Sequence, residues 1–539
     1  MRRVNQNELE AAFSLPKAPA RDPDPLFGQP EAKAALSLLA AGRSPLFLGL
    51  PPGFDLEGQV GGFLRRLLAE RDEDPGLALV PEGSGLRAVW GGGSGHPLRP
   101  PGPPSVLVLP APSEPQLFGR FLPRMTTSGA ALTFEDYEPG ALVRAGSGVL
   151  LVSADALAQT PELARKLFAA VREGSYLPTP PPQLPAPAFP EIPVRARLVV
   201  AGSEEAIRNL PLPPEPWIVP LRETLPLRPR TLAWLWGYLE GRAGPLSKRE
   251  LRRIARRLRR QAGHRERIAP ALSPLLGLLQ ARDQGLALND ALDRLRVTEG
   301  AGQTRFLDEL AEGLWALELA GSRVGEAVGL LVVEEEGGSY GRPARITASA
   351  APGRDGVVSI EREVQLAGPL FGKAVLTLAG YLRRRYAEVG PLSATIQIVF
   401  EQTEETINGD SAGLAELLAV LSILSGLALR QDLAITGAVD QTGRVLPVGG
   451  VSGKAEGLLA AADTLGVAQV GLLLPEANLK NLVPEGSLSE ALGSGRLLVY
   501  LVRTVDEAIE LAFGRAAERV HRAVADRLRA FRKLEDGDR

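Results

Sequence analysis

The chain has 539 residues and a net charge of −2, with 45% hydrophobic and 23% charged residues. This length is too great for one hydrophobic core and predicts about three domains, and the composition is that of a globular protein. The small net charge gives no overall attraction to nucleic acid or membranes. Because the sequence has no cysteine, disulfides, thiolate metal sites and cysteine catalysis are excluded.

Residues 1–230 predict an α/β domain. Helical patterns separate four apolar runs that are typical of buried parallel strands: 44–50, 105–110, 148–154 and 195–202. Proline-rich stretches such as PLRPPGPPSV (97–106) and PLPPEPWIVP (211–220) favour irregular connections over regular elements.

The sequence GLPPGFDLEGQ (49–59) has the strand–turn–helix order of a phosphate-binding loop. Such a loop ends in Gly-Lys-Ser/Thr, whose lysine meets the phosphates and whose hydroxyl holds magnesium. Here Asp55 and Glu57 fall in that place, where carboxylates would repel phosphate, and we interpret them as helix-start acids. The strand GVLLVSADA (148–156) lacks the acidic pair expected to hold magnesium, and Asp155 stands one position beyond it. ATPase activity is therefore not expected.

Residues 231–321 lose the strand signal and predict a helical domain. Within it, the segment 248–266 is strongly basic. We expect the solvated face of an amphipathic helix, with Leu251, Ile254 and Leu258 turned inward. The alternative is a contact with nucleic acid or an acidic partner, because a dense basic segment attracts phosphates.

Residues 322–515 predict a second α/β unit, and residues 516–539 a charged helical tail. The unit begins with a hairpin and continues through a helix and a strand to a long apolar helix at 411–425. Two short strands around the turn DQTGR follow, and then three helices alternate with two strands.

Ser411 lies just before a helix that is apolar all round and must therefore be buried. Its N-terminus then points unpaired N–H groups into a defined site. The simplest interpretation is that Asp410 or Ser411 caps the helix. A nucleophilic role needs a base, and none of the three histidines lies between residues 322 and 515. A Ser-His-Asp triad within this segment is therefore impossible.

Lys454 is one of only eight lysines, and it opens a helix after the glycine-rich sequence VLPVGGVSG. A lysine in the first turn is at the unfavourable end of the helix dipole. If the turn is buried, desolvation and the dipole lower the pKa of the amine, so that Lys454 can take the proton of a serine. The alternative is a surface lysine near a turn; Lys373 and Lys480 lie in ordinary amphipathic contexts.

Four separated segments strongly resemble the proteolytic domain of archaeal-type, or Lon-like, Lon proteases: GRPARITA (341–348), EREVQLAGPLFGKAVL (361–376), NGDSAGLAELLAVLSILSG (408–426) and QDLAITGAVDQTGRVLPVGGVSGKAEG (431–457). The resemblance covers about residues 322–515. It implies a mixed α/β fold and hexameric rings that enclose the active sites.

The resemblance also assigns roles. It implies that Ser411 is the nucleophile, that Lys454 is its base, that Thr436 orients the lysine and that Asp410 helps to shape the site. Asn408 departs from the family pattern, because many archaeal-type relatives carry an acid there, and its role is left open.

The first 320 residues resemble, more faintly, the AAA+ module of the same proteins, chiefly through FGRFLPRMTTSGAALTFEDYEPGALVRAGSGVLLVSADAL (118–157). Because its nucleotide motifs are degenerate, the chain resembles the ATP-independent Lon-like group called LonC. The expected fold class is thus a multidomain α/β protein with a degenerate AAA+-like domain, a helical domain and a Lon-type proteolytic domain.

The expected function is ATP-independent cleavage of unfolded or loosely structured polypeptides by a Ser-Lys dyad inside a homohexamer, without cofactor or metal. A cytoplasmic location is expected, because the first residues lack the apolar core of a signal peptide. The run 412–430 carries Glu416 and is too short for a convincing membrane span. The alternatives are an ATP-driven Lon protease with an unconventional nucleotide site, or a non-enzymatic ring-forming chaperone or nucleic-acid-binding scaffold.

Overall fold

The computed structural model describes residues 2–4, 13–39, 45–83, 85–92, 95–122, 125–126, 129–130, 132–181, 187–281, 301–335, 338–366, 368–402 and 409–537. The chain forms two compact units. The N-terminal unit comprises residues 14–258 and 268–285, and the C-terminal unit comprises 1–13, 259–267 and 286–539. Each unit combines helices with a sheet, so the α/β fold class is confirmed. The finer division into four domains stays a prediction.

The N-terminal unit is built on a five-stranded parallel sheet in the order β15-β2-β14-β11-β6. The strands are β2 (Leu46–Gly49), β6 (Val106–Leu109), β11 (Val149–Ser153), β14 (Arg197–Gly202) and β15 (Trp217–Pro220). The four apolar runs all form strands, as expected. The expectation of an irregular connection at 211–220 is wrong, because its second half forms β15. That strand is half-exposed at the sheet edge, where proline is tolerated.

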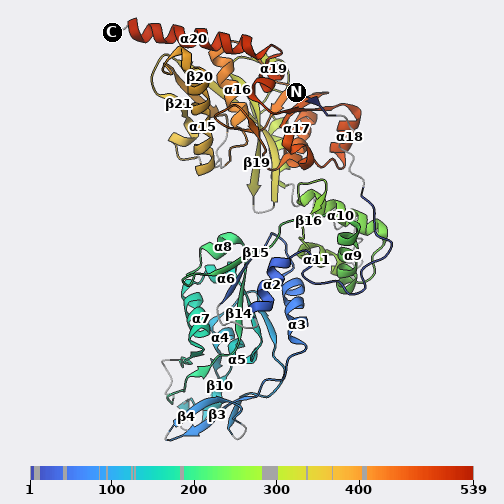
Figure 1. Ribbon diagram of the computed structural model, residues 1–539, viewed down its shortest axis with the longest axis vertical. Coiled ribbons are helices and arrows are strands. Elements are labelled where there is room, and N and C mark those ends of the chain that lie inside the picture. The colour runs from blue at the N-terminus through green and yellow to red at the C-terminus, as the bar shows by residue number, and fades with distance from the viewer. Residues whose placement is uncertain are drawn as a thin grey trace. The chain divides into compact units, whose positions relative to one another are not determined.

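Helices cover both faces of this sheet (Figure 1). One face packs against α2 (Pro30–Leu39) and α3 (Gly62–Leu68), and α3 continues a π-helical turn, η1 (Leu56–Gly61). The other face packs against α4 (Glu114–Phe118), α5 (Ala141–Arg144), α6 (Ala154–Ala158), α7 (Pro161–Glu173) and α8 (Glu204–Arg208).

Short antiparallel elements decorate this unit. A three-stranded sheet consists of β3 (Leu77–Glu82), β4 (Gly85–Trp90) and β5 (His96–Arg99). The expectation of an irregular segment at 97–106 is therefore wrong at its start, which belongs to β5. The two-residue strands are β7 (Arg120–Phe121), β8 (Met125–Thr126), β9 (Gly129–Ala130), β10 (Tyr137–Glu138), β12 (Ser175–Tyr176) and β13 (Ile192–Pro193), with a 3-10 turn η2 (Phe134–Asp136).

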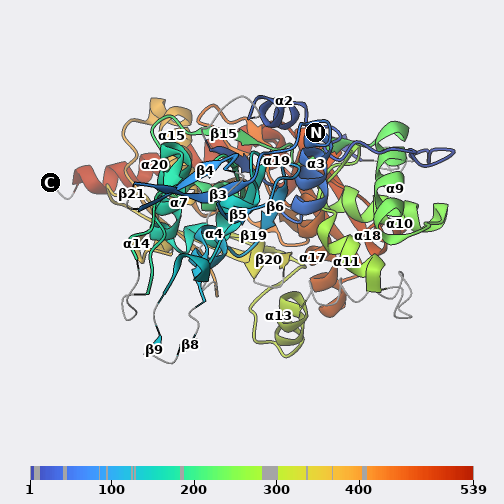
Figure 2. The same ribbon diagram turned by 90° about the horizontal axis from the view of Figure 1, so that it is seen from below.

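The region expected to be helical contains α9 (Pro229–Ala243), α10 (Lys248–Gln261), α11 (Ser273–Ala281) and α13 (Ala301–Ala311). Helices α9, α10 and α11 are grouped together in Figure 2. Short strands β16 (Leu225–Pro226) and β17 (Arg267–Ile268) flank them. Leu251, Ile254 and Leu258 of α10 are fully buried, which confirms the predicted inward face.

The C-terminal unit contains an eight-stranded mixed sheet in the order β1-β28-β27-β24-β19-β20-β22-β21. Its strands are β1 (Arg2–Arg3), β19 (Glu326–Glu335), β20 (Gly338–Ala351), β21 (Gly356–Ser359), β22 (Thr395–Phe400), β24 (Leu433–Ile435), β27 (Val470–Pro475) and β28 (Leu497–Val502). Strands β19 and β20 form the expected antiparallel hairpin. Strand β1 pairs antiparallel with β28, and no periodic pattern in the sequence marks it.

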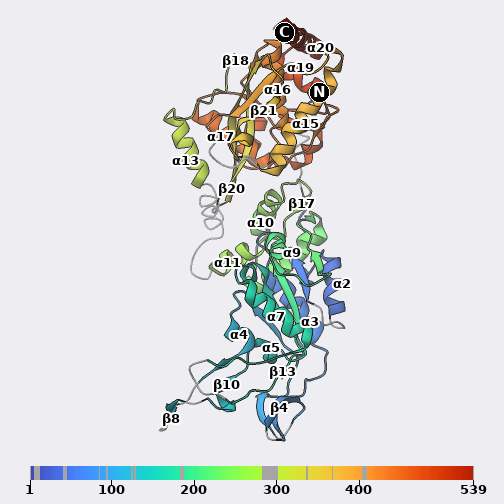
Figure 3. The same ribbon diagram turned by 90° about the vertical axis from the view of Figure 1, so that its left-hand side faces the viewer.

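Two hydrophobic cores lie on opposite faces of this sheet, because Ala327 and Leu331 of β19 belong to one and Val328 and Leu330 to the other. The first core holds α15 (Pro369–Arg385), α16 (Gly413–Ser425), α19 (Val505–Phe513) and α20 (Ala517–Gly537). The second holds α17 (Val451–Thr464), α18 (Ser487–Ser494) and α13, which lies beside α17 in Figure 3. Helices α16 and α17 therefore belong to opposite layers.

The remaining elements are α14 (Ile360–Glu363), β18 (Ser322–Arg323), β23 (Leu429–Arg430), β25 (Ala438–Val439), β26 (Val445–Leu446), η4 (Ala387–Val389) and η5 (Glu476–Asn481). Strands β25 and β26 are the two expected around the turn DQTGR. Within the described ranges, no helix is long and apolar enough to cross a membrane.

Candidate active site

Ser411 lies two residues before α16, which is buried along almost its whole length. The helix begins at Gly413 with Ala412 as its N-cap, and no side chain caps it. The capping interpretation of Asp410 and Ser411 is therefore wrong. Ser411 itself is partly exposed, so its hydroxyl is accessible beside a buried helix end.

The carbonyl group of Ser411 is fixed by the residues that follow β24. Thr436 donates a hydrogen bond from Oγ1 to the Ser411 carbonyl at 3.1 Å, and Gly437 donates its N–H to the same oxygen at 2.8 Å. Leu414 of α16 in turn donates its N–H to the Gly437 carbonyl at 2.9 Å. The carboxyl end of β24 thus holds the backbone of Ser411 in place, while the hydroxyl of Ser411 meets a different partner.

That partner is Lys454. Its helix, α17, begins at Val451, three residues earlier than expected, so Lys454 is in the first turn but does not open the helix. The Lys454 side chain is only 1% exposed. Its Nζ lies 2.7 Å from Ser411 Oγ and 3.0 Å from Thr436 Oγ1. The structure therefore brings Ser411, Lys454 and Thr436 together where the start of α16, the end of β24 and the start of α17 meet.

Burial lowers the pKa of Lys454 to about 8, and the charge of Asp410 opposes this by raising it. Asp410 is exposed and contacts α16 through its backbone, because its carbonyl accepts the Gly413 N–H at 3.1 Å. Asp410 is thus near enough to act on Lys454 electrostatically. The rival lysines Lys373 and Lys480 are both exposed.

Two glycines allow β20 to approach α17 closely enough to position Lys454. A Cβ on Gly457 would lie 1.8 Å from the carbonyl oxygen of Gly341, and a Cβ on Gly341 would lie 2.5 Å from the Cα of Lys454. No larger residue fits at either position without moving strand and helix apart. This contact depends on tertiary packing, and the sequence analysis did not find it.

A buried amide holds the loop that precedes α17. Asn478 is 1% exposed; its Oδ1 accepts the N–H of Val448 at 2.8 Å, and its Nδ2 donates to the carbonyl of the same residue at 2.8 Å. The loop residues Gly449 and Gly450 are exposed, so this double hydrogen bond is their local anchor. The pairing of Asn478 with the backbone of a residue 30 positions away carries no local signal.

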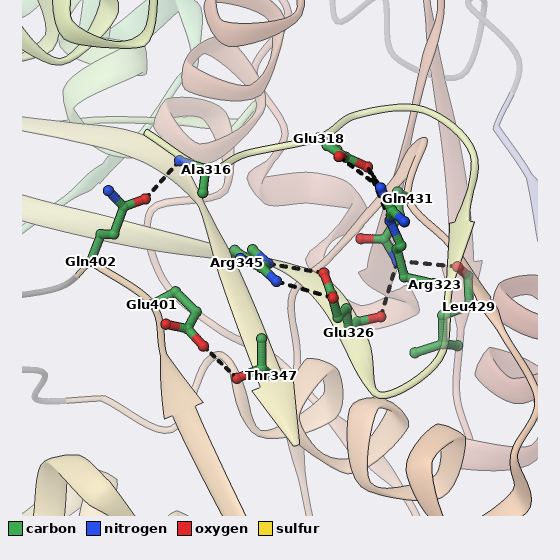
Figure 4. A network of polar contacts seen from close by, with 10 residues as sticks. All are labelled: Ala316, Glu318, Arg323, Glu326, Arg345, Thr347, Glu401, Gln402, Leu429 and Gln431. Atoms are coloured by element: carbon green, nitrogen blue, oxygen red, sulfur yellow. Dashed lines mark hydrogen bonds and ion pairs between the residues drawn. The ribbon is translucent and has the colours of Figure 1, made fainter. Parts of the chain in front are cut away.

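The chain leaves β22 toward Ser411 through an anchored residue. Gln402 has a φ of 55°, accepts the N–H of Ala316 at 2.6 Å (Figure 4) and donates to the carbonyl of Leu314 at 2.7 Å. These contacts fix the end of β22. Residues 403–408, including Asn408, lie outside the described residues.

Side chains also link strands β19, β20 and β22. Arg345 of β20 pairs with both carboxylate oxygens of Glu326 of β19, at 2.9 and 3.0 Å (Figure 4). Thr347 of β20 donates to Glu401, which follows β22, at 2.7 Å. The three strands are therefore linked by side chains as well as by their ladders.

The nucleotide-like region of the N-terminal unit holds its acids in internal contacts. Asp55 caps η1 by accepting the Gly58 N–H at 2.9 Å, which confirms its prediction as a helix-start acid. Asp155 accepts hydrogen bonds from the N–H and hydroxyl of Ser203, at 3.2 and 2.7 Å. No cluster of three or more potential metal ligands occurs among the residues that the structure describes.

Comparisons with known proteins agree with this arrangement. Residues 393–515 match the Lon protease (S16) C-terminal proteolytic domain, and residues 103–211 match a LonB-like AAA domain. A Lon protease homolog of Escherichia coli strain K12 is 31% identical over 230 residues, which are 42% of this chain and 39% of the relative. A homolog from Haemophilus influenzae is 34% identical over 213 residues, 39% of this chain and 35% of the relative.

An archaeal Lon protease of Thermococcus kodakarensis is 25% identical over 406 residues, which are 70% of this chain and 61% of that protein. The chain therefore spans less than two thirds of the length of each of these relatives. The family matches include Ser411 and Lys454 and three strands of the N-terminal sheet, β6, β11 and β14. Residues 393–515 are thus similar to the Lon proteolytic-domain family, and residues 103–211 are similar to the LonB-like AAA family.

Proposed function

We propose that this chain is an ATP-independent serine endopeptidase in which Ser411 is the nucleophile and Lys454 the general base. The observation that carries the proposal is the 2.7 Å contact between Ser411 Oγ and the buried amine of Lys454, whose pKa is lowered to about 8. With that pKa about a tenth of the amine is neutral at pH 7, against roughly 3 in 10,000 for an ordinary lysine. The lowered pKa thus raises the population of active base by more than two orders of magnitude.

The chemistry follows from these positions. Ser411 Oγ attacks the carbonyl carbon of the peptide bond while Lys454 Nζ takes the hydroxyl proton. Backbone N–H groups at the start of α16 stabilise the oxyanion, as preorganised donors do in acyl transfer. When the C–N bond breaks, Lys454 returns the proton to the leaving amine. Water, activated by the again neutral Lys454, then hydrolyses the ester and restores Ser411.

We assign supporting roles to two further residues. Thr436 Oγ1 contacts both Lys454 Nζ and the carbonyl of Ser411, so it orients the amine toward the hydroxyl. The negative charge of Asp410 stabilises the protonated amine of Lys454. It therefore raises the pKa of Lys454, whereas burial lowers it. Asp410 thus limits how far the pKa of Lys454 is lowered.

The proposed substrates are unfolded or loosely structured polypeptides. Asp55 and Glu57 stand where an ATP-driven motor needs a lysine and a hydroxyl, so we propose that no nucleotide, cofactor or metal is used. We further propose a cytoplasmic homohexamer whose N-terminal units form a scaffold and entrance around an inner chamber. This assembly is what the resemblance of residues 322–515 to Lon proteases implies. Nucleic-acid binding by α10 is not favoured, because Arg259 and Arg260 of this helix form ion pairs with Glu485 and Glu456.

The test is digestion of one unfolded and one stably folded protein, each with and without ATP and magnesium. The wild type should cleave the unfolded protein at the same rate in both conditions and leave the folded one intact. Lys454→Ala should lose cleavage, whereas Lys373→Ala, which removes an exposed lysine, should keep it. Acceleration by ATP would favour an ATP-driven protease instead. Salt-sensitive DNA binding together with absent cleavage would favour a scaffold.

A further inference from the structure

The first turn after β2 is the place where phosphate-binding loops hold their ligand. In such loops the phosphates lie against the N–H groups at the start of the following helix. In this chain η1 and α3 follow β2 as one continuous helical run, Leu56–Leu68. Asp55 lies at its start and is buried, with 9% of the residue and 11% of its side chain exposed.

Three kinds of donor converge on this carboxylate. Gly58 donates its N–H to Oδ1 at 2.9 Å, and Tyr238 donates its hydroxyl to Oδ2 at 2.7 Å. Arg242 Nη1 lies 3.5 Å from Oδ2. A helix N–H, a hydroxyl and a guanidinium are the groups that proteins use to hold phosphate. Here they hold a carboxylate of the same chain.

The space around the carboxylate is filled. A Cβ on Gly58 would lie 2.1 Å from Asp55 Oδ2, 2.3 Å from the Tyr238 hydroxyl and 2.4 Å from Arg242 Cζ. Burial, followed by the hydrogen bond to Asp55, raises the pKa of Tyr238, so its hydroxyl stays a donor. The guanidinium of Arg242 also lies 5.2 Å from the Tyr238 ring centroid, which holds the two α9 side chains together.

We propose that the Asp55 carboxylate is a built-in anion that takes the place of a nucleotide phosphate and fastens α9 to the start of η1 without a ligand. Tyr238 and Arg242 both belong to α9, so a single carboxylate joins the sheet-bearing part of the N-terminal unit to its first helix beyond the sheet. The contact of Asp155 with Ser203 joins the ends of β11 and β14 in the same internal manner. On this proposal the junction between η1 and α9 stays closed without a nucleotide.

This inference rests on the proposed nucleotide independence and gives a structural reason for it. Its test does not use peptidase activity. Thermal unfolding of the full chain is compared for wild type, Asp55→Ala and the matched control Glu57→Ala. Glu57 lies at the same helix start, but its side chain is 68% exposed and pairs with Arg65 at the surface. Asp55→Ala should lower the midpoint by about 4–8 °C, and Glu57→Ala by about 1 °C or less.

Anion rescue makes the test specific. At matched ionic strength, millimolar sulfate or pyrophosphate should raise the unfolding midpoint of Asp55→Ala part of the way back to that of the wild type. The reason is that an added anion can bind the donors that Asp55 no longer occupies. The same salts should not shift wild type or Glu57→Ala beyond the effect of chloride. ATP with magnesium should leave the wild-type midpoint unchanged. A midpoint of Asp55→Ala equal to that of Glu57→Ala, or an ATP-induced rise in wild type, would overturn the proposal.

A second set of variants keeps the proposal testable if Asp55→Ala does not fold. Tyr238→Phe keeps the ring and loses only the hydroxyl, and Arg242→Met keeps the stem and loses the charge. Each should lower the midpoint, and the loss in the double variant Asp55→Asn/Arg242→Met should be smaller than the sum of its single losses. Strictly additive losses would contradict the shared contact. Because Ser411 and Lys454 are untouched, a failure here leaves the peptidase proposal standing, and the reverse also holds.

Discussion

At the scale of single residues, Lys454 determines the expected pH dependence of cleavage. Its pKa is lowered to about 8 by burial, and only the neutral amine can take the proton of Ser411. The rate should therefore rise with pH, roughly 50-fold between pH 6 and 8, and level off above pH 9. Initial rates on an unfolded peptide between pH 6 and 9.5 measure this. A flat profile, or a midpoint near 10, would contradict the assignment of Lys454 as base.

A second titrating residue, Glu416, affects stability instead of rate. It lies in α16 with 1% exposure, neither carboxylate oxygen has a hydrogen-bond partner, and burial and then the charge of Glu361 raise its pKa to about 8. The folded chain thus binds one more proton than the unfolded chain between pH 4.5 and 8. The contribution of Glu416 to stability is therefore complete below pH 4.5 and is lost as the pH rises to about 8 and above, by up to roughly 5 kcal/mol.

The variant Glu416→Gln should remove this fall. Chemical denaturation of wild type and Glu416→Gln at pH 5 and pH 8 measures the difference, and the variant should gain relative stability at pH 8. Glu388→Gln, at an exposed site, is the matched control and should follow the wild type. An identical pH slope in wild type and Glu416→Gln would show that Glu416 does not titrate in this range.

The sequence predicted that Ser411 and Lys454 form a pair, because histidine is absent between residues 322 and 515 and because a lysine stands at the unfavourable end of a helix. The structure places the two side chains 2.7 Å apart, and their catalytic roles stay a prediction. Asn478 and Gly341 were missed, since their importance lies in contacts with residues distant in the chain. Local patterns do not encode such contacts.

At the scale of elements, the approach of β20 to α17 determines where the amine of Lys454 lies. Gly457→Ala places a methyl group 1.8 Å from the carbonyl of Gly341, so α17 must shift away from the strand. A displacement of about 1 Å at a catalytic group can cost roughly 100-fold in kcat. We expect such a loss for Gly457→Ala, measured on an unfolded peptide with the folded state checked by circular dichroism.

Gly453→Ala is the control for this prediction, because it lies in the same helix but its added Cβ meets nothing closer than 3.7 Å. It should lose less than about threefold. Equal losses for both variants would mean that helix propensity, and not the strand contact, is responsible.

The sequence predicted elements well where apolar periodicity is strong, as in the four parallel strands and in the β19–β20 hairpin. It failed at β15, because proline suggested a loop and the edge position that tolerates proline is a tertiary property. The sequence was also misleading at the start of α16. Serine is a common N-cap residue, but the N-cap of this helix is Ala412 and the side chain of Ser411 does not cap it.

At the scale of the whole molecule, the chain combines a segment similar to the Lon proteolytic domain with one similar to a LonB-like AAA domain, and before the latter Asp55 of the nucleotide-like loop accepts a hydrogen bond from Tyr238. If the N-terminal unit does not act as a motor, only substrate molecules that have already unfolded by themselves can be cleaved. The cleavage rate in a substrate series of graded stability should therefore be proportional to the unfolded fraction of each substrate. Equal rates across the series would indicate an active unfolding device.

The most direct measurement is the initial rate at which wild type and Ser411→Ala cleave a permanently unfolded protein in the absence of nucleotide. Removing Oγ leaves the backbone contacts of Ser411 with Thr436 and Gly437 unaltered, so Ser411→Ala should fold and melt like the wild type. We expect cleavage by the wild type and none above background by Ser411→Ala. Undiminished cleavage by a folded Ser411→Ala would contradict the assignment of Ser411 as the nucleophile.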